Sequence, residues 1–336
     1  MKRGCIGTLC LLSLWLLTGC VRQETVHSRQ IFAMDTIMEF TVWGPGGEAA
    51  LDEAEEEIHR LDDLLSTGNP DSEVSRLNRE GGGTVSEDVG RLISASLDAY
   101  RSTGGIFDFT IYPLMELWGF PARNCRVPEE KEIADILPLI DASLVQFSGG
   151  VLTLAEDQQM DFGGIAKGYA SSRLMEIFQP CGVTAGMVSL GGNVQTFGVK
   201  PGGSPWRIGI QDPNAPRGTP LAVFETADRA VVTSGGYERY FEENGRTYSH
   251  ILSPSTGYPV ETDLASATVI SADGVLADVL STALYSMGLE AAIPYWRDAG
   301  VDFDMVLLTS SGTLYVTEGV GGLQTDSPVT TLYREP

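Results

Sequence analysis

Helical and strand-like patterns alternate irregularly along this chain of 336 residues, and their order constrains the fold more than any other feature. Apolar residues at helical spacing predict helices over 47–65, 86–101, 129–140, 165–178 and 275–287. Runs of β-branched and aromatic residues predict strands over 31–43, 185–199, 206–211, 221–226, 264–270 and 303–317, and a hairpin over 144–160. Such an order, without a regular βαβ repeat, is typical of an α+β domain.

The N-terminus predicts export. Lys2 and Arg3 precede an apolar run over 6–17 that is too short to span a bilayer comfortably. The run ends in Leu-Thr-Gly-Cys at 17–20, which resembles the lipobox of bacterial lipoproteins. We therefore expect a signal peptide over 1–19, lipid on Cys20 and a tether over 20–30. Such a protein is membrane-anchored, on the outer face of the cytoplasmic membrane or in the periplasm. The alternative is an ordinary secretory signal in which Cys20 is incidental.

Charge and cysteine content exclude several function classes. The chain has 22 basic and 45 acidic residues, a formal net charge of −23, so nucleic acid is not expected as a partner. An anionic ligand therefore requires a locally positive site or a bound metal. Only Cys125 and Cys181 remain after the signal and Cys20, and they form no zinc or iron–sulfur pattern. Whether these two cysteines pair is open.

The turn at 161–170, Asp-Phe-Gly-Gly-Ile-Ala-Lys-Gly-Tyr-Ala, is a candidate phosphate site. Asp161 leads into two glycines and Lys167 at the start of a predicted helix. Free backbone N–H groups, the helix dipole and a cation would then surround one small volume that suits a diphosphate. The alternative is a tight turn with no ligand.

Asp278 and Thr282 are a candidate metal pair. In a helix they lie one turn apart on the same face, and their oxygens suit Mg²⁺ or Ca²⁺ better than zinc. The alternative is an Asp favoured by the helix dipole and a Thr bonded to its own backbone.

His250 is a candidate general base, because it adjoins a turn-rich stretch and histidine titrates near neutrality. A purely structural histidine is the alternative. The aromatic residues within 104–110 are expected to pack either against a flat heterocycle or in the core.

Seven segments together resemble the successive motifs of one family, the FAD:protein FMN transferases or ApbE family. These segments are LSTGNPDSEVSRLN, GGIFDFTIYPLMELWGF, DFGGIAKGYA, VSLGGNVQTFG, TSGGYERYF, YSHILSPSTGYPV and LADVLSTAL. The resemblance runs from about residue 31 to 288. It implies an internally duplicated, T-fold-like α+β domain over 31–336, with mixed sheets packed against helices. It also implies Mg²⁺-dependent transfer of the FMN part of FAD to a Thr or Ser hydroxyl, with release of AMP. The implied acceptors are exported or membrane subunits of electron-transfer complexes.

The resemblance assigns roles to individual positions. It implies Asp278, Thr282 and the Gly164 carbonyl as Mg²⁺ ligands, and His250 and Asp278 as catalytic. The FAD-binding positions that it implies are Met34, Ile106, Phe107, Asp108, Asp161, Lys167 and Ile251. The chain departs from the family pattern at Gly68, Gly236 and Ser253. Two alternatives stay open: a lipoprotein that stores or delivers FAD, and an FAD diphosphatase giving FMN and AMP.

Overall fold

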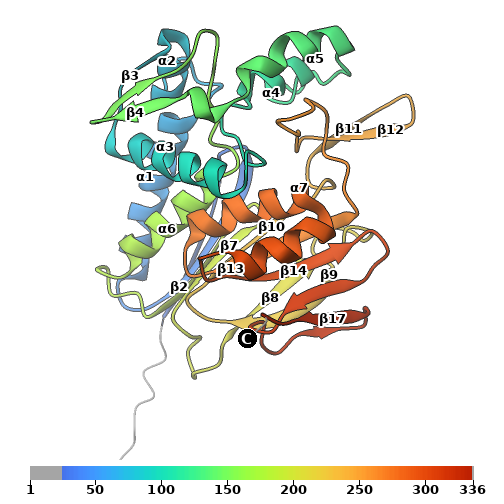
Figure 1. Cartoon of the computed structure of the whole chain (residues 1–336). Helices are drawn as coiled ribbons and strands as arrows, with labels where there is room; N and C mark the ends of the chain where they lie inside the picture. Colours follow the sequence, from blue (N-terminus) through green and yellow to red (C-terminus); the bar gives the residue numbers. More distant parts are fainter. Residues whose placement is uncertain (1–24, 335–336) are drawn as a thin grey trace, which may run out of the picture.

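A nine-stranded sheet forms the centre of the molecule. The structure is a computed structural model that describes residues 25–334 (Figure 1). Neighbouring strands run antiparallel except for the last pair, β15 and β17, which is parallel. In spatial order the strands are β1 (Val26–Ala33), β2 (Thr36–Trp43), β6 (Ala185–Leu190), β7 (Asn193–Phe197), β10 (Ala230–Ser234), β13 (Leu264–Ser271), β14 (Asp304–Thr309), β15 (Leu314–Thr317) and β17 (Val329–Leu332).

Three long helices cover one face of this sheet: α1 (Gly47–Leu65), α6 (Ala166–Phe178) and α7 (Gly274–Asp298). Helix α7 packs against α6, β10 and β13, and its helical geometry breaks at Gly288, where φ is 74°. The other face is covered by a three-stranded sheet of β8 (Trp206–Gln211), β9 (Pro220–Thr226) and β16 (Gln324–Thr325). Apolar side chains therefore fill two layers, one on each side of the large sheet.

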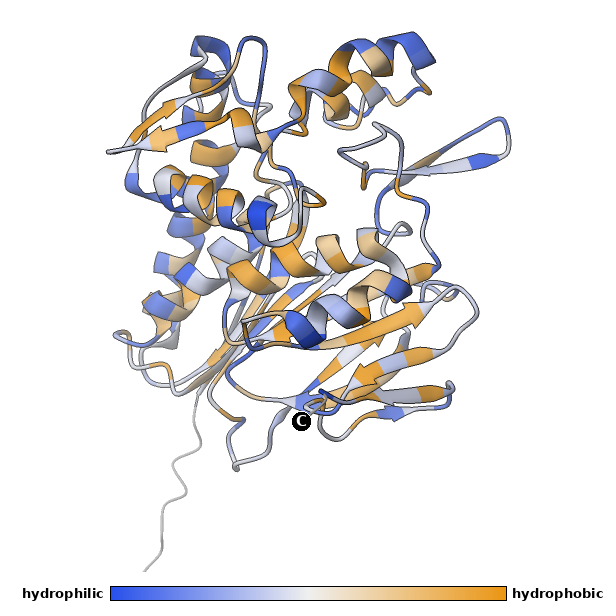
Figure 2. Ribbon diagram, in the orientation of Figure 1, coloured by the Kyte–Doolittle hydropathy of each residue, from blue (hydrophilic) through white to orange (hydrophobic). Residues whose placement is uncertain are grey.

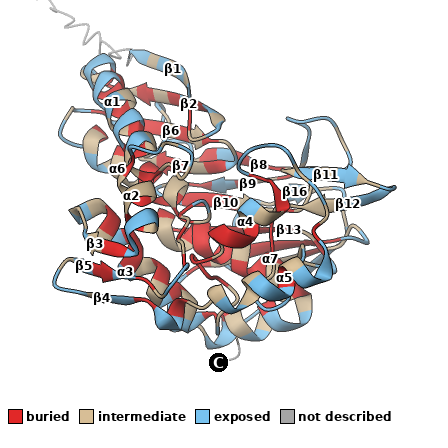
Figure 3. Cartoon of the chain, turned by 90° about the horizontal axis from the view of Figure 1, so that it is seen from above, coloured by how far each residue is buried: buried red, intermediate tan, exposed pale blue. Residues whose placement is uncertain are grey.

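Smaller elements lie beyond the helical face, towards one end of the large sheet (Figure 1). One group comprises α2 (Glu73–Glu80), β3 (Gly82–Thr84), α3 (Glu87–Ser102), β4 (Gln146–Ser148) and β5 (Val151–Thr153). A second comprises α4 (Tyr112–Trp118), α5 (Glu130–Ile136), two short 3₁₀ turns (Leu137–Leu139 and Ala142–Leu144) and the hairpin β11 (Tyr240–Glu243) and β12 (Arg246–Ser249). Much of this hairpin is exposed, whereas α7, β10 and β13 are mostly buried (Figure 3).

Helix α7 is both long and apolar. Among residues 25–334 it alone is long and apolar enough to cross a membrane by length and composition. However, 56% of its most apolar window is buried inside the fold. Figure 2 shows hydrophobic residues along α7 and along the strands beneath it. Contact with the central sheet therefore accounts for its apolar character.

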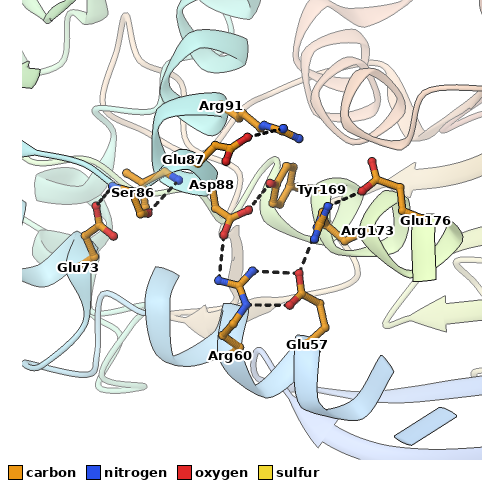
Figure 4. Close-up of polar contacts among 11 residues, drawn as sticks. Glu57, Arg60, Glu73, Ser86, Glu87, Asp88, Arg91, Tyr169, Arg173 and Glu176 are labelled. Carbon is orange, nitrogen blue, oxygen red and sulfur yellow. Dashed lines mark hydrogen bonds and ion pairs between the residues drawn. The ribbon is translucent and has the colours of Figure 1, made fainter. Parts of the chain in front are cut away.

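Ion pairs and hydrogen bonds connect the helices α1, α3 and α6 (Figure 4). Glu57 accepts hydrogen bonds from Arg60 at 2.7 Å and from Arg173 at 3.1 Å. Asp88 accepts a hydrogen bond from the Tyr169 hydroxyl and pairs with Arg60 at 2.8 Å. The network ties α6, whose first turn lines the candidate site, to two other helices.

The structure confirms the mixed α+β class and most of the predicted elements, and it corrects several boundaries. The predicted strand over 31–43 is a hairpin that turns at Met34 and Asp35, where φ is 47° and 61°. Its first strand starts at Val26, opposite Trp43, so the predicted tether over 20–30 extends too far. The single strands predicted over 185–199 and 303–317 are each two strands.

One further helix boundary is corrected, and some predictions lie outside what the structure describes. The third predicted helix, over 129–140, ends at Ile136 and continues only as a 3₁₀ turn. Cys125 and Cys181 are both free thiols. The predicted signal peptide and Cys20 lie outside the described residues, and internal duplication stays a prediction.

Candidate functional site

A cavity of about 940 Å³ opens where the end of the large sheet meets α6, α7 and the second group of small elements. Its wall contains every site residue predicted from the sequence. These residues are Met34, Ile106, Phe107, Asp108, Asp161, Gly164, Lys167, His250, Ile251, Asp278 and Thr282. The chain brings them together from five separate segments, as far apart as residues 34 and 282.

Two glycines allow α6 and α7 to cross closely beside the cavity. A Cβ atom built on Gly168 would lie only 2.2 Å from the Gly274 carbonyl oxygen and 2.7 Å from the Asp278 Cβ. A Cβ atom on Gly274 would lie 2.7 Å from the Gly168 carbonyl oxygen. Neither position tolerates a side chain without movement of backbone, so glycine here sets the distance between the two helices.

Asp278 lies at this crossing and is 4% exposed. Its Oδ2 accepts a hydrogen bond from the Gly168 N–H at 2.7 Å. Burial raises the pKa of Asp278, and the nearby Lys167 charge and the α6 N–H groups oppose that rise. A buried carboxylate with so little compensation is suited to bind a cation.

Thr282 lies one helical turn beyond Asp278, as predicted. The Ser234 hydroxyl, at the end of β10, lies 3.1 Å from Thr282 Oγ1 and 2.9 Å from Ser281 Oγ. The end of β10 thus holds the hydroxyl of Thr282 near the cavity. Among the residues that the structure describes, no group of three or more His, Cys, Asp or Glu side chains forms a metal site. A cation here would have one carboxylate, with hydroxyl and carbonyl oxygens beside it.

The turn before α6 brings Lys167 and the N-terminus of α6 to the cavity wall, but the predicted free N–H groups are largely bonded. Ile165 and Ala166 donate to the Phe162 carbonyl oxygen, and Gly168 donates to Asp278. The Asp161 carboxylate accepts a hydrogen bond from the Gly163 N–H. Burial raises the pKa of Asp161, whereas this hydrogen bond and the Lys167 charge lower it. The Lys167 ammonium lies 3.4 Å from the Gly163 carbonyl oxygen. Gly164 lies under the Phe107 ring, since a Cβ atom there would be 3.0 Å from Phe107 Cε2. A cation, a helix N-terminus and an aromatic ring therefore share one wall.

His250 follows β12 and is oriented by the backbone. Its Nδ1 lies 3.0 Å from the Arg239 carbonyl oxygen, which can only accept a hydrogen bond. Nδ1 must therefore carry the proton. Burial lowers the pKa of His250 to about 4, so the ring is neutral at pH 7. Nε2 is then unprotonated, on a residue that lines the cavity.

The other predicted FAD positions shape the wall in different ways. Met34 occupies the β1–β2 turn, and Ile251 is buried beside His250. Both oxygens of the Asp108 carboxylate are already bonded: Oδ1 to Thr110 at 2.6 Å and 2.8 Å, and Oδ2 to the Ala142 N–H at 3.0 Å. Its side chain therefore holds the 106–110 loop in place.

Several cavity residues were not identified from the sequence. Asn193 and Ser234 line the wall at the end of the sheet, and Arg239 and Arg123 line it near His250. The Arg239 side chain donates to the Phe120 carbonyl oxygen at 2.6 Å, while its own carbonyl orients His250. Asn193, Ser234 and Arg239 lie inside motifs that carried the family resemblance. Their place inside these motifs was the only sequence signal for the three residues, and it assigned no role to any of them.

One departure from the family pattern has a structural explanation. A Cβ atom on Gly236 would lie 2.6 Å from the Tyr285 hydroxyl, so Tyr285 occupies the space that a side chain would need. Ser253 bonds to the Ser255 hydroxyl at 3.0 Å within its turn. Nothing in the structure explains Gly68.

Known proteins resemble this chain over most of its length. A model described as the ApbE family matches residues 34–305. A Klebsiella pneumoniae protein named FAD:protein FMN transferase is 33% identical over 260 residues, covering 76% of this chain and 80% of that protein. A Vibrio cholerae protein of the same name is 31% identical over 313 residues, covering 90% and 93%.

Solved structures are similar as well. The crystal structure of the ApbE protein from Thermotoga maritima has 31% identity and a TM-score of 0.82, covering 88% of this chain and 97% of that one. The apo form of the flavinyl transferase ApbE from Pseudomonas stutzeri has 33% identity and a TM-score of 0.78, covering 89% and 96%.

Proposed function

This chain belongs to the ApbE family of FAD:protein FMN transferases, and from that premise we propose that it transfers the FMN part of FAD to a Thr or Ser hydroxyl of an acceptor protein, releasing AMP. One observation carries the proposal. A single cavity gathers the Asp278–Thr282 pair, Lys167 at a helix N-terminus, and a neutral His250 with an unprotonated ring nitrogen.

The oxygens beside the α6–α7 crossing fit Mg²⁺. Asp278, Thr282 and the Gly164 carbonyl are hard donors, and Asp278 is buried with little to compensate its charge. Mg²⁺ in proteins is commonly held by one or two carboxylates together with substrate phosphates, which matches a site with one carboxylate. When bound, Mg²⁺ would neutralise charge on the diphosphate and on the departing AMP.

The other residues bind the donor. Lys167 provides positive charge for the phosphates in a protein whose net charge is −23, and the dipole of α6 adds to it at the same wall. Phe107 and Ile106 present apolar surface beside that position, against which a flat ring system can pack.

His250 acts as the general base. Its Nε2 accepts the proton of the acceptor hydroxyl, while the Arg239 carbonyl keeps Nδ1 protonated and the ring in place. The hydroxyl oxygen then forms a bond to the phosphorus of the FMN phosphate. The bond between that phosphorus and the bridging oxygen breaks, and the oxygen leaves with AMP.

The cellular setting is part of the proposal. The basic start, the short apolar run and the Leu-Thr-Gly-Cys sequence at 17–20 support an exported lipoprotein held at a membrane by lipid on Cys20. Its acceptors would then be exported or membrane subunits of flavin-dependent electron-transfer complexes.

The test is transfer to a peptide that contains a Thr acceptor. Wild-type protein with FAD and Mg²⁺ should add the mass of FMN minus water to the peptide and release one AMP per transfer. Asp278→Ala should abolish both. Asp298→Ala, which changes an exposed residue at the far end of the same helix, should leave both unchanged.

Three other results would each contradict part of this proposal. Full transfer by Asp278→Ala would refute the metal site. Release of AMP by the wild type without any acceptor would favour the diphosphatase alternative. Retention of intact FAD in the presence of Mg²⁺ and peptide would favour a flavin carrier.

A further inference from the structure

Asn193, the first residue of β7, has a buried side-chain amide without a partner. The residue is 1% exposed, and neither its Oδ1 nor its Nδ2 forms a hydrogen bond to any residue that the structure describes. It nevertheless lines the cavity. Buried polar atoms in proteins are nearly always hydrogen-bonded, so an unbonded amide on a residue of the cavity wall is a candidate for bonding to a ligand.

The strand register shows how unusual this amide is. Asn193 pairs with Leu190 on one side and with Val232 on the other, and the same row continues to Met38 and Val269. Residues directly opposite one another across strands point to the same face of a sheet. The other four members of this row are apolar and buried against the helical layer. Asn193 is thus one polar residue in a row of hydrophobic side chains.

The same register places Asn193 beside the proposed metal pair. Val232 lies opposite Asn193, and Ser234 is two residues farther along the same strand. Such a diagonal pair of residues lies roughly 7–8 Å apart. The Ser234 hydroxyl is 3.1 Å from Thr282 Oγ1. Asn193, Ser234 and Thr282 therefore lie along one part of the cavity wall.

We propose that Asn193 is a further binding residue for the diphosphate of the dinucleotide, with its Nδ2 donating a hydrogen bond to a non-bridging phosphate oxygen. This inference rests on the proposed function, because that function places the diphosphate at Asp278 and Thr282. An amide suits the position because it donates to an anion without adding charge to a buried row.

The experiment measures equilibrium binding of three ligands to the full-length protein by flavin fluorescence and calorimetry. FAD contains the whole dinucleotide, ADP contains a diphosphate without flavin, and riboflavin contains flavin without phosphate. Asn193→Leu should bind FAD and ADP roughly 10- to 100-fold more weakly, the range expected for one hydrogen bond to a charged group, and should bind riboflavin unchanged. Asn193→Asp should bind FAD more weakly still, because a carboxylate repels phosphate.

A second measurement separates binding from structure. Because the amide has no protein partner, Asn193→Leu should melt at or above the temperature of the wild type without ligand. Ser266→Ala is the matched control: Ser266 Oγ is also buried and unbonded, but the residue does not line the cavity. It should leave FAD and ADP affinity unchanged.

Three results would overturn the inference. Unchanged ADP affinity in Asn193→Leu would show that the amide does not bind the diphosphate. Equal or tighter Mg²⁺ and FAD binding by Asn193→Asp would identify Oδ1 as a metal ligand instead. A markedly lower melting temperature of ligand-free Asn193→Leu would assign the amide a structural role. Wild-type protein that binds FAD but transfers nothing would refute the proposed function alone, since these readouts need no transfer.

Discussion

The α6–α7 crossing is the feature whose perturbation tests the site geometry most directly. Gly168→Ala adds one methyl group at a point where its Cβ would lie 2.2 Å from the Gly274 carbonyl oxygen and 2.7 Å from the Asp278 Cβ. Both contacts involve atoms that cannot rotate away. The helices must therefore separate, and the first turn of α6 must shift relative to Asp278.

The expected cost follows from two contributions. Overpacking of this kind costs about 1–3 kcal/mol. Separation of the helices also weakens the 2.7 Å hydrogen bond from the Gly168 N–H to Asp278, and a bond to a charged group contributes about 1.5–3 kcal/mol. The higher helix propensity of alanine offsets up to about 1 kcal/mol of this cost. The free energy of unfolding should therefore fall by about 2–5 kcal/mol.

Urea unfolding of the ligand-free protein measures this change, and the melting temperature should fall by about 2 °C for each kcal/mol. Transfer activity should fall as well, because Lys167 and Gly164 move away from Asp278. Gly300→Ala is the control, since a Cβ atom there meets nothing within 4 Å. If Gly168→Ala were as stable and as active as Gly300→Ala, the close crossing that we describe would be wrong.

Three further predictions test other parts of the molecule. Mg²⁺ should raise the melting temperature of the wild type at pH 7 but not that of Asp278→Asn, because burial disfavours the ionised carboxylate until a cation binds; an equal rise in both would contradict the metal assignment. The hydrogen bond from the Arg60 side chain lowers the pKa of Glu57. The ionised Glu57 therefore stabilises the fold above about pH 4.3, and this stabilisation is lost as pH falls through the lower folded-state pKa. Glu57→Gln should therefore cost about 1–3 kcal/mol in urea unfolding at pH 7 and progressively less as pH falls below about 4.3, and a loss independent of pH would argue against a charge effect. Gly236→Asp should destabilise the fold by about 1–3 kcal/mol, and Tyr285→Phe in the same chain should restore part of that loss by removing the hydroxyl 2.6 Å from the new Cβ.

Elements with strong local periodicity were predictable from the sequence. The helix over 47–65 has the predicted bounds, because the apolar residues of its predicted face recur at helical spacing and are buried: Leu51, Ala54, Ile58, Leu61 and Leu65. The hairpins within 31–43 and 185–199 were merged into single strands, because short turns interrupt the β pattern only briefly. Gly191 and Gly192 make one of these turns with φ of 63° and 102°, a conformation that glycine permits but does not require.

The candidate site was predictable to a similar degree. Asp278 and Thr282 could be paired from helix geometry, because four residues in a helix make one turn. Asn193 and Ser234 could not be paired, because only strand register relates two residues that are 41 positions apart. Arg239 was missed for another reason: it acts through its carbonyl, and any residue type has a carbonyl.

The amino-acid sequence by itself determined where the longest helices lie and that Asp278 and Thr282 share one helix face, because these properties depend on neighbours along the chain. The tertiary structure decided that the five segments with predicted site residues meet in one cavity and that two glycines bring α6 against α7. It also decided that one amide in an apolar row lacks a partner. Those facts depend on strand order and helix crossing, which are set by how the whole chain buries its apolar surface and not by any local pattern.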